Sequence, residues 1–134
     1  MASILFVCDR NACRSQIAEA LCRRDAPKTW LVASAGVEPS AQEDPRAVES
    51  LRRHGLVVSV NRPKGFEALP EVEWDVLVFL GTGAMPALPE ARRTIQWPVA
   101  GPDDTPALSC DEIVKDLEAR VADLLLLISE PSKT

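Results

Sequence analysis

Short apolar runs and helix-like segments alternate along this chain, and that alternation constrains its fold more than any other feature. Runs typical of buried parallel strands occur at residues 3–7, 30–34, 74–80 and 94–97. Segments with the apolar spacing of helices alternate with them, at residues 15–26, 44–55, 65–69 and 109–129. This order predicts an α/β fold, in which right-handed crossovers build a parallel sheet with both faces covered.

The residue types at the helix ends support these boundaries. Asp44 can cap the second helix and Pro45 suits its first turn, while Gly55 is a good stop. Ser109 and Glu112 have the spacing of a capping box at the start of the last helix.

Length and composition predict one domain over residues 1–134. Hydrophobic residues make up 46% of the chain and charged residues 26%, which is wrong for a disordered protein. The longest apolar run, residues 124–128, is far shorter than the roughly 18 residues of a membrane span. The first residues lack a basic segment and a cleavage site, so we expect a cytoplasmic protein with no membrane partner. In that compartment four cysteines are more often thiols or catalysts than structural disulfides.

The charge of the chain is unevenly distributed. Residues 1–65 hold ten Lys and Arg against seven Asp and Glu, whereas residues 66–134 hold five against thirteen. A basic N-terminal half in a chain of net charge −5 suggests that an anion is handled there, with scattered surface charge as the alternative. The overall acidity argues against nucleic acid as a partner.

The loop after the first strand carries the residues with the clearest chemistry. Parallel sheets bind ligands at the carboxyl ends of their strands, and Cys8 stands at such an end, six residues before Arg14. In this C-x5-R pattern, backbone N–H groups and a helix N-terminus can surround an oxyanion that Arg14 holds with two hydrogen bonds. Cys8, facing the same groups, would be a thiolate nucleophile. We call residues 9–14 the oxyanion loop; its members are Asp9, Arg10, Asn11, Ala12, Cys13 and Arg14.

Each of these residues also has a simpler interpretation. Cys8 could be a buried structural thiol at the end of a core strand, and Arg14 a solvated arginine in the first helical turn. The helix dipole disfavours a cation at that end, which itself points to a bound anion. Ser15 can cap the helix and can also donate a hydrogen bond to the Cys8 thiolate.

The loop and the segments around it resemble the low-molecular-weight protein tyrosine phosphatase superfamily, which includes the thioredoxin-coupled arsenate reductases. The most specific part of the resemblance is residues 8–15 with Ser34-Ala35-Gly36 downstream. The resemblance spans nearly the whole chain, through residues 17–20, 44–48, 75–80 and 96–98. It implies a three-layer α/β/α domain whose four-stranded parallel sheet has the flavodoxin-like order 2-1-3-4.

The same resemblance implies roles for individual residues. Cys8 would be the nucleophile, Arg14 the oxyanion clamp and Ser15 the residue that supports the thiolate. Asn11 would adopt a left-handed conformation, which Asn tolerates, and bond to Ser34. Cys13 would form a protective disulfide with the nucleophile; the alternative, from the residue itself, is a small buried hydrophobe.

The chain departs from the phosphatase pattern where the general acid should lie. Gly101-Pro102 occupies the expected Asp-Pro position, so Asp103 or Asp104 would have to serve as the acid, or both are solvated loop residues. No aromatic residue follows Pro98 to hold a phosphotyrosine ring. Trp30 and Phe66 could line a pocket, but core packing explains both better.

Other features favour the reductase branch in part. Ser15-Gln16 and the helix start at residues 44–48 are similar to that branch, yet residues 80–86 contain no cysteine for its internal relay. Cys22 and Cys110 are expected to be packing residues. A reductase of this kind would discharge its Cys8–arsenate adduct to a small external thiol, a redox partner, or Cys13.

We therefore expect a cysteine-dependent phosphatase that hydrolyses phosphomonoesters through a phosphocysteine. The alternatives are an arsenate reductase that uses a small thiol, and a non-catalytic protein that binds an oxyanion or senses peroxide. His54 is the only histidine and no cysteine pair has zinc spacing, so we expect no metal and no organic cofactor.

Overall fold

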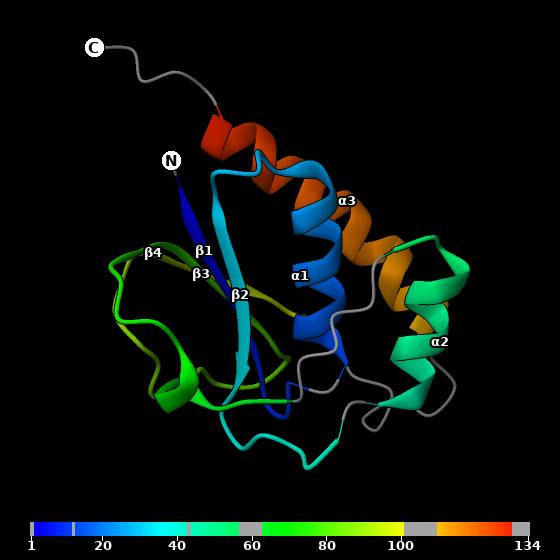
Figure 1. Cartoon of the computed structure of the whole chain (residues 1–134). Coiled ribbons are helices and arrows are strands. Elements are labelled where there is room, and N and C mark those ends of the chain that lie inside the picture. Colours follow the sequence, from blue (N-terminus) through cyan, green and yellow to red (C-terminus); the bar gives the residue numbers. More distant parts are fainter. Residues whose placement is uncertain (1, 12, 43, 57–62, 101–109, 130–134) are drawn as a thin grey trace.

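The structure, a computed structural model, describes residues 2–11, 13–42, 44–56, 63–100 and 110–129. Strands and helices alternate along the chain as predicted (Figure 1). Their order is β1 (Ser3–Cys8), α1 (Arg14–Asp25), β2 (Leu31–Gly36), α2 (Pro45–Arg53), the 3-10 turn η1 (Phe66–Ala68), β3 (Trp74–Leu80), β4 (Ala91–Trp97) and α3 (Cys110–Ser129).

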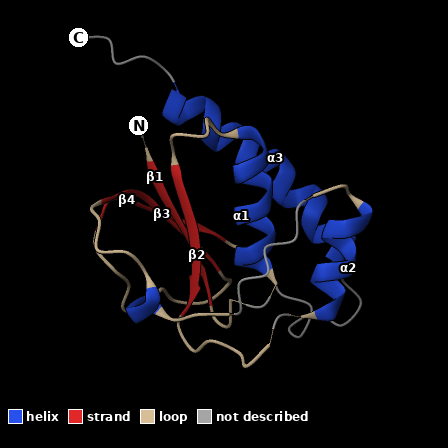
Figure 2. Cartoon of the chain, in the orientation of Figure 1, coloured by secondary structure: helices blue, strands red, loops and turns tan. Residues whose placement is uncertain are grey.

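The four strands form a parallel sheet of order β2-β1-β3-β4, which confirms the predicted topology (Figure 2). β1 lies in the centre, where Cys8 is paired with Gly36 of β2 and Val7 with Phe79 of β3. This register brings the carboxyl ends of β1, β2 and β3 to one edge, at which ligands of parallel sheets bind.

Helices cover one face of the sheet. Side chains alternate across a strand, so Ile4, Phe6 and Cys8 of β1 face α1, α2 and α3, while Leu5 and Val7 face the opposite side. In the described part of the chain, the opposite face is covered by η1 and its neighbouring loops rather than by a long helix (Figure 1). Prolines punctuate this connection, and they cannot donate the hydrogen bonds that extend a helix.

The last helix, α3, packs along α1 through one apolar stripe. Its buried residues repeat with helical spacing and include Ile113, Val114, Leu117, Val121 and Leu124. Leu126 and Leu127 lie on the other side of the helix and are 68% and 51% exposed. No helix among the described residues is long and apolar enough to cross a membrane.

The start of β4 differs from the sequence-based expectation. β4 begins three residues earlier than position 94, because Arg92 and Arg93 belong to it although they are exposed and charged. Backbone pairing with β3 extends this edge strand without needing an apolar run. The predicted cap of α3 at Ser109 lies outside the described residues.

The start and end of α2 are as predicted. The Asp44 carboxylate accepts a hydrogen bond from the Arg46 backbone N–H at 2.9 Å, which satisfies one of the unpaired donors of the first turn. Gly55 follows the helix with φ of 70°, a left-handed conformation that favours glycine.

Replacing Asp44 by Ala should therefore lower the free energy of unfolding by about 1 kcal/mol at pH 7. Hydrogen bonds from the Arg46 guanidinium hold the pKa of the Asp44 carboxyl below its usual value. A lowered folded-state pKa stabilises the fold above the unfolded pKa, and this contribution disappears as the pH falls through the folded value. Denaturant unfolding at several pH values from 7 to 2 measures both effects.

The Asp44→Ala protein should consequently lose less stability below about pH 4 than the parent does. Glu71→Ala, in an exposed loop, is the control and should change stability by less than about 0.5 kcal/mol. Equal stability of Asp44→Ala and the parent at pH 7 would contradict the capping role.

Candidate active site

The candidate site begins at the end of β1, where Cys8 leaves the sheet on the helical face. Cys8 is 2% exposed, and its Sγ lies 3.0 Å from the Ser15 hydroxyl oxygen. Ser15 is the second residue of α1, and the N-cap position belongs to Cys13, whose side chain makes no capping bond. The N-cap interpretation of Ser15 was therefore wrong, whereas the contact with the Cys8 sulfur is present.

Asn11 determines the direction of the hydrogen bonds around Cys8. It has φ of 54°, and its Nδ2 donates to Ser15 Oγ at 2.8 Å and to Ser34 Oγ at 2.9 Å. The left-handed conformation and the bond to Ser34 are both as the resemblance implied. Because Nδ2 can only donate, Ser15 Oγ accepts this bond, and its own proton is available to the Cys8 sulfur.

The network continues from Ser34 to a buried carboxylate that the sequence did not reveal. Ser34 Oγ donates to Glu19 Oε1 at 2.5 Å, and Glu19 is only 4% exposed. Arg23, one helical turn later, forms an ion pair with Glu19 at 2.8 Å. The one sequence signal was this i, i+4 spacing, which is usually a surface pair.

The oxyanion loop is attached by its carbonyl groups to the segment that follows β2. These hydrogen bonds run from the N–H groups of Val37, Glu38 and Ser40 to the carbonyls of Cys8, Asp9 and Arg10, at 3.1, 2.7 and 3.0 Å. The described peptide bonds are trans, so each N–H group points away from the carbonyl of the preceding residue. The N–H groups of Asp9, Arg10 and Asn11 therefore point to the opposite side of the loop, away from residues 37–40.

Gly36 explains why this loop can lie so close to β2. A Cβ at this position would lie 2.8 Å from both the Arg10 carbonyl carbon and the Asn11 nitrogen, closer than a real Cβ approaches backbone atoms. The loop backbone thus passes where a side chain would be, and the third residue of Ser34-Ala35-Gly36 must be glycine.

Two parts of the chain hold Arg14 at the start of α1. Its Nη1 donates to the Val99 carbonyl at 2.9 Å, and its Nη2 lies 3.8 Å from Asp9 Oδ2. The guanidinium is largely buried, whereas the Asp9 side chain is 65% exposed. Arg14 is therefore a cation beside Asp9.

The structure separates the four cysteines into different environments, and all are free thiols. Cys13 Sγ lies 3.8 Å from Cys110 Sγ, which the spacing of 97 residues gave no reason to expect. Cys22 is enclosed by the core, and burial raises the pKa of its thiol to about 12. The expectation of a packing role thus suits Cys22, while Cys110 has a thiol neighbour.

Some predicted site residues lie outside the described part of the chain. They are Ala12 in the oxyanion loop and the candidate acids Asp103 and Asp104. Their roles remain predictions. Trp30 and Phe66 pack against the two apolar clusters on opposite faces of the sheet, in agreement with the core interpretation.

Comparison with known families extends the geometric argument to the whole chain. The family described as low molecular weight phosphotyrosine protein phosphatase matches residues 3–130. The chain belongs to this family. In the structure Cys8 ends β1 and Arg14 begins α1, within the residues that the family matches.

The proteins similar to this chain include both arsenate reductases and a phosphatase. A glutaredoxin arsenate reductase of Synechocystis sp. is 26% identical over 132 residues, which cover 96% of this chain and all of the relative. A low molecular weight phosphotyrosine protein phosphatase of Sus scrofa is 42% identical over 62 residues, 40% of this chain and 39% of the relative. A solved arsenate reductase in the phosphate binding state has a TM-score of 0.84 at 26% identity, covering 96% of this chain and all of that one.

Replacing Gly36 by Ala should destabilise the protein by about 1–3 kcal/mol, because the new methyl group collides with backbone atoms of the oxyanion loop. Gly83→Ala is a matched control, since a Cβ at that glycine meets no atom within 4 Å. Denaturant unfolding of both variants measures the difference. If both variants unfold at the same denaturant concentration as the parent, the close approach does not matter for the fold.

Proposed function

We propose that this protein is an arsenate reductase in which Cys8 attacks the arsenic atom and a second thiol releases arsenite. The observation that carries the proposal is the Cys8 Sγ held 3.0 Å from Ser15 Oγ, a hydroxyl that accepts a hydrogen bond from Asn11 and has its own proton available to the sulfur. A hydroxyl proton in this position stabilises the thiolate, the reactive form of cysteine.

The oxyanion loop supplies what the first step requires. Arsenate carries negative charge, and the loop N–H groups, the N-terminus of α1 and the Arg14 guanidinium can neutralise it. The first turn of α1 holds no acidic side chain to repel the anion. The Cys8 thiolate would attack arsenic, a sulfur–arsenic bond would form, and one arsenate oxygen would leave as water after protonation.

The second step distinguishes reduction from hydrolysis. A thiol attacks the Cys8 sulfur, a disulfide forms, and the electron pair of the sulfur–arsenic bond stays on arsenic, which leaves as arsenite. This step requires a second thiol and no carboxylic acid. Cys13 belongs to the same loop and is the nearest candidate in sequence, with a small external thiol as the alternative.

Similarity to known proteins also supports reduction over hydrolysis. The Synechocystis relative, matched over its full length, is named an arsenate reductase, and so is the solved structure with a TM-score of 0.84. That solved relative is described in a phosphate binding state, which supports a tetrahedral oxyanion as the ligand. We therefore rank reduction first, although the sequence alone favoured phosphomonoester hydrolysis.

Phosphatase activity is the second candidate, and the identity of 42% to the Sus scrofa phosphatase over 62 residues favours it. The same cradle would accept a phosphomonoester, and Cys8 would form a phosphocysteine. Asp103 or Asp104 would then have to protonate the leaving oxygen, a contribution typically worth 10²–10⁴-fold in rate.

Steady-state assays on the full chain test both candidates side by side. One measures arsenite release from arsenate in the presence of glutathione or of a dithiol such as dithiothreitol. The other measures hydrolysis of an aryl phosphate. We expect thiol-dependent arsenite release, and Cys8→Ser should reduce it by at least about 10³-fold while phosphate binding persists.

Cys22→Ala is the matched control, because it removes a cysteine from the core without touching the oxyanion loop. It should retain arsenite release. Hydrolysis of the aryl phosphate without arsenite release would favour the phosphatase. Phosphate binding with neither activity would favour a non-catalytic oxyanion-binding protein, and undiminished turnover by Cys8→Ser would refute Cys8 as the nucleophile in both reactions.

A further inference from the structure

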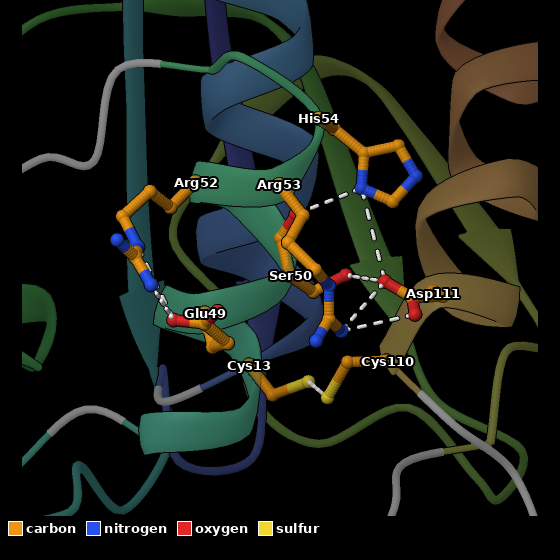
Figure 3. A network of polar contacts seen from close by, with 8 residues as sticks. All are labelled: Cys13, Glu49, Ser50, Arg52, Arg53, His54, Cys110 and Asp111. Atoms are coloured by element: carbon orange, nitrogen blue, oxygen red, sulfur yellow. Dashed lines mark hydrogen bonds and ion pairs between the residues drawn. The ribbon is translucent and has the colours of Figure 1, made fainter.

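Cys13 and Cys110 form a buried pair of thiols. The reaction proposed above gives Cys13 a possible part in it and Cys110 none. Cys13 precedes α1 in the oxyanion loop, and Cys110 is the first residue of α3. Their sulfur atoms lie 3.8 Å apart, and the two residues are 7% and 5% exposed. Figure 3 shows the two sulfurs facing each other beside the contacts between α2 and α3.

A polar network holds the first turn of α3 in the position that creates this pair. The Asp111 carboxylate accepts hydrogen bonds from the Ser50 hydroxyl and from Arg53 Nη2, the latter at 2.9 Å (Figure 3). His54 Nδ1 lies 3.8 Å from the same carboxylate. Since Asp111 directly follows Cys110, these contacts with α2 keep the Cys110 side chain against Cys13.

The two thiols differ in their chemistry. The hydrogen bond between them lowers the pKa of Cys110 and raises the pKa of Cys13. The N-terminus of α3 also favours negative charge on its first residue. Of the two thiols Cys110 is thus the more acidic.

We propose that Cys110 is the resolving thiol of the reaction, and that the oxidised product is a Cys13–Cys110 disulfide. The proposal rests on arsenate reduction as the function. Cys110 would then take part in the chemistry directly, because its sulfur would form a bond to the Cys13 sulfur during each cycle. An external dithiol would then reduce this disulfide and restore both thiols.

The steps balance in atoms and electrons. Cys13 loses its proton to solvent and attacks the Cys8 sulfur, a Cys8–Cys13 disulfide forms, and arsenic leaves as arsenite with the electron pair of its bond to sulfur. Cys110 then loses its own proton to solvent and attacks the Cys13 sulfur. Cys8 departs as a thiolate, ready for the next arsenate, and the two electrons given to arsenic have come from Cys13 and Cys110.

The geometry supports the second exchange. A disulfide needs its sulfur atoms about 2.05 Å apart, so the sulfurs must approach by less than 2 Å from the present 3.8 Å. Rotation about the Cα–Cβ bonds moves sulfur atoms over that range.

Peptide mapping by mass spectrometry after a single turnover tests the proposal. Fully reduced protein receives one equivalent of arsenate without external thiol, and the remaining thiols are alkylated before digestion. We expect one arsenite per chain and a Cys13–Cys110 disulfide in the parent. Cys110→Ser should still release one arsenite but stop at a Cys8–Cys13 disulfide, and its steady-state turnover with dithiothreitol should fall at least about 10-fold.

Cys22→Ala serves again as the control and should give the parent's disulfide and turnover. Arsenite release from the parent with a Cys8–Cys13 disulfide, together with unchanged turnover of Cys110→Ser, would overturn the proposal and leave arsenate reduction intact. Thermal unfolding of Cys110→Ser and Cys110→Ala, followed by circular dichroism, shows that any loss comes from a folded protein.

A second experiment uses no arsenate and separates this proposal from the proposed function. Cys8→Ser and the parent are equilibrated in a series of glutathione redox buffers, and the disulfides are mapped in the same way. A Cys13–Cys110 disulfide in both proteins supports the pairing even if no arsenite is ever released. Its absence under oxidising conditions that do not unfold the protein overturns the pairing for any substrate.

Discussion

The geometry of the site depends on the side-chain amide of Asn11. One amide nitrogen donates to Ser15 and to Ser34, so both hydroxyls receive a proton from the same group. The Ser34 hydroxyl donates to the buried Glu19 carboxylate, and the proton of the Ser15 hydroxyl is available to the Cys8 sulfur. Hydrogen bonds thus link Cys8 to Glu19 through Ser15, Asn11 and Ser34, and Asn11 takes part with a left-handed backbone.

The sheet and the loop support each other through backbone contact. Residues 37–40 pair with the loop carbonyls, and Gly36 leaves the space in which the loop backbone lies. Because the carbonyls are used on that side, the amide groups face the other, which is the arrangement an anion requires. The register of β1 with β2 therefore determines the chemistry of the loop as much as the sequence of the loop does.

Pattern and resemblance predicted the parts of this protein that depend on local sequence. Apolar spacing predicted the strands and helices, the loop residues predicted the contact of Cys8 with Ser15, and the family resemblance implied the contact of Asn11 with Ser34. Glu19 and Cys110 were missed, because one resembles a surface residue of a helix and the other meets its partner across 97 residues. Contacts of that kind follow from helix packing, which the spacing of residues along the chain does not encode. Asp103 and Asp104 lie outside the described residues, so their roles stay predictions.

The position of Cys110 at the start of the last helix has a topological consequence. A bond to Cys13 would close a loop of 97 residues that contains β2, β3 and β4. In the chain-entropy view, a cross-link over about 100 residues restricts the unfolded chain by about 4–5 kcal/mol at 25 °C. The oxidised chain would then be the harder form to unfold, and its melting temperature would be higher than that of the reduced chain.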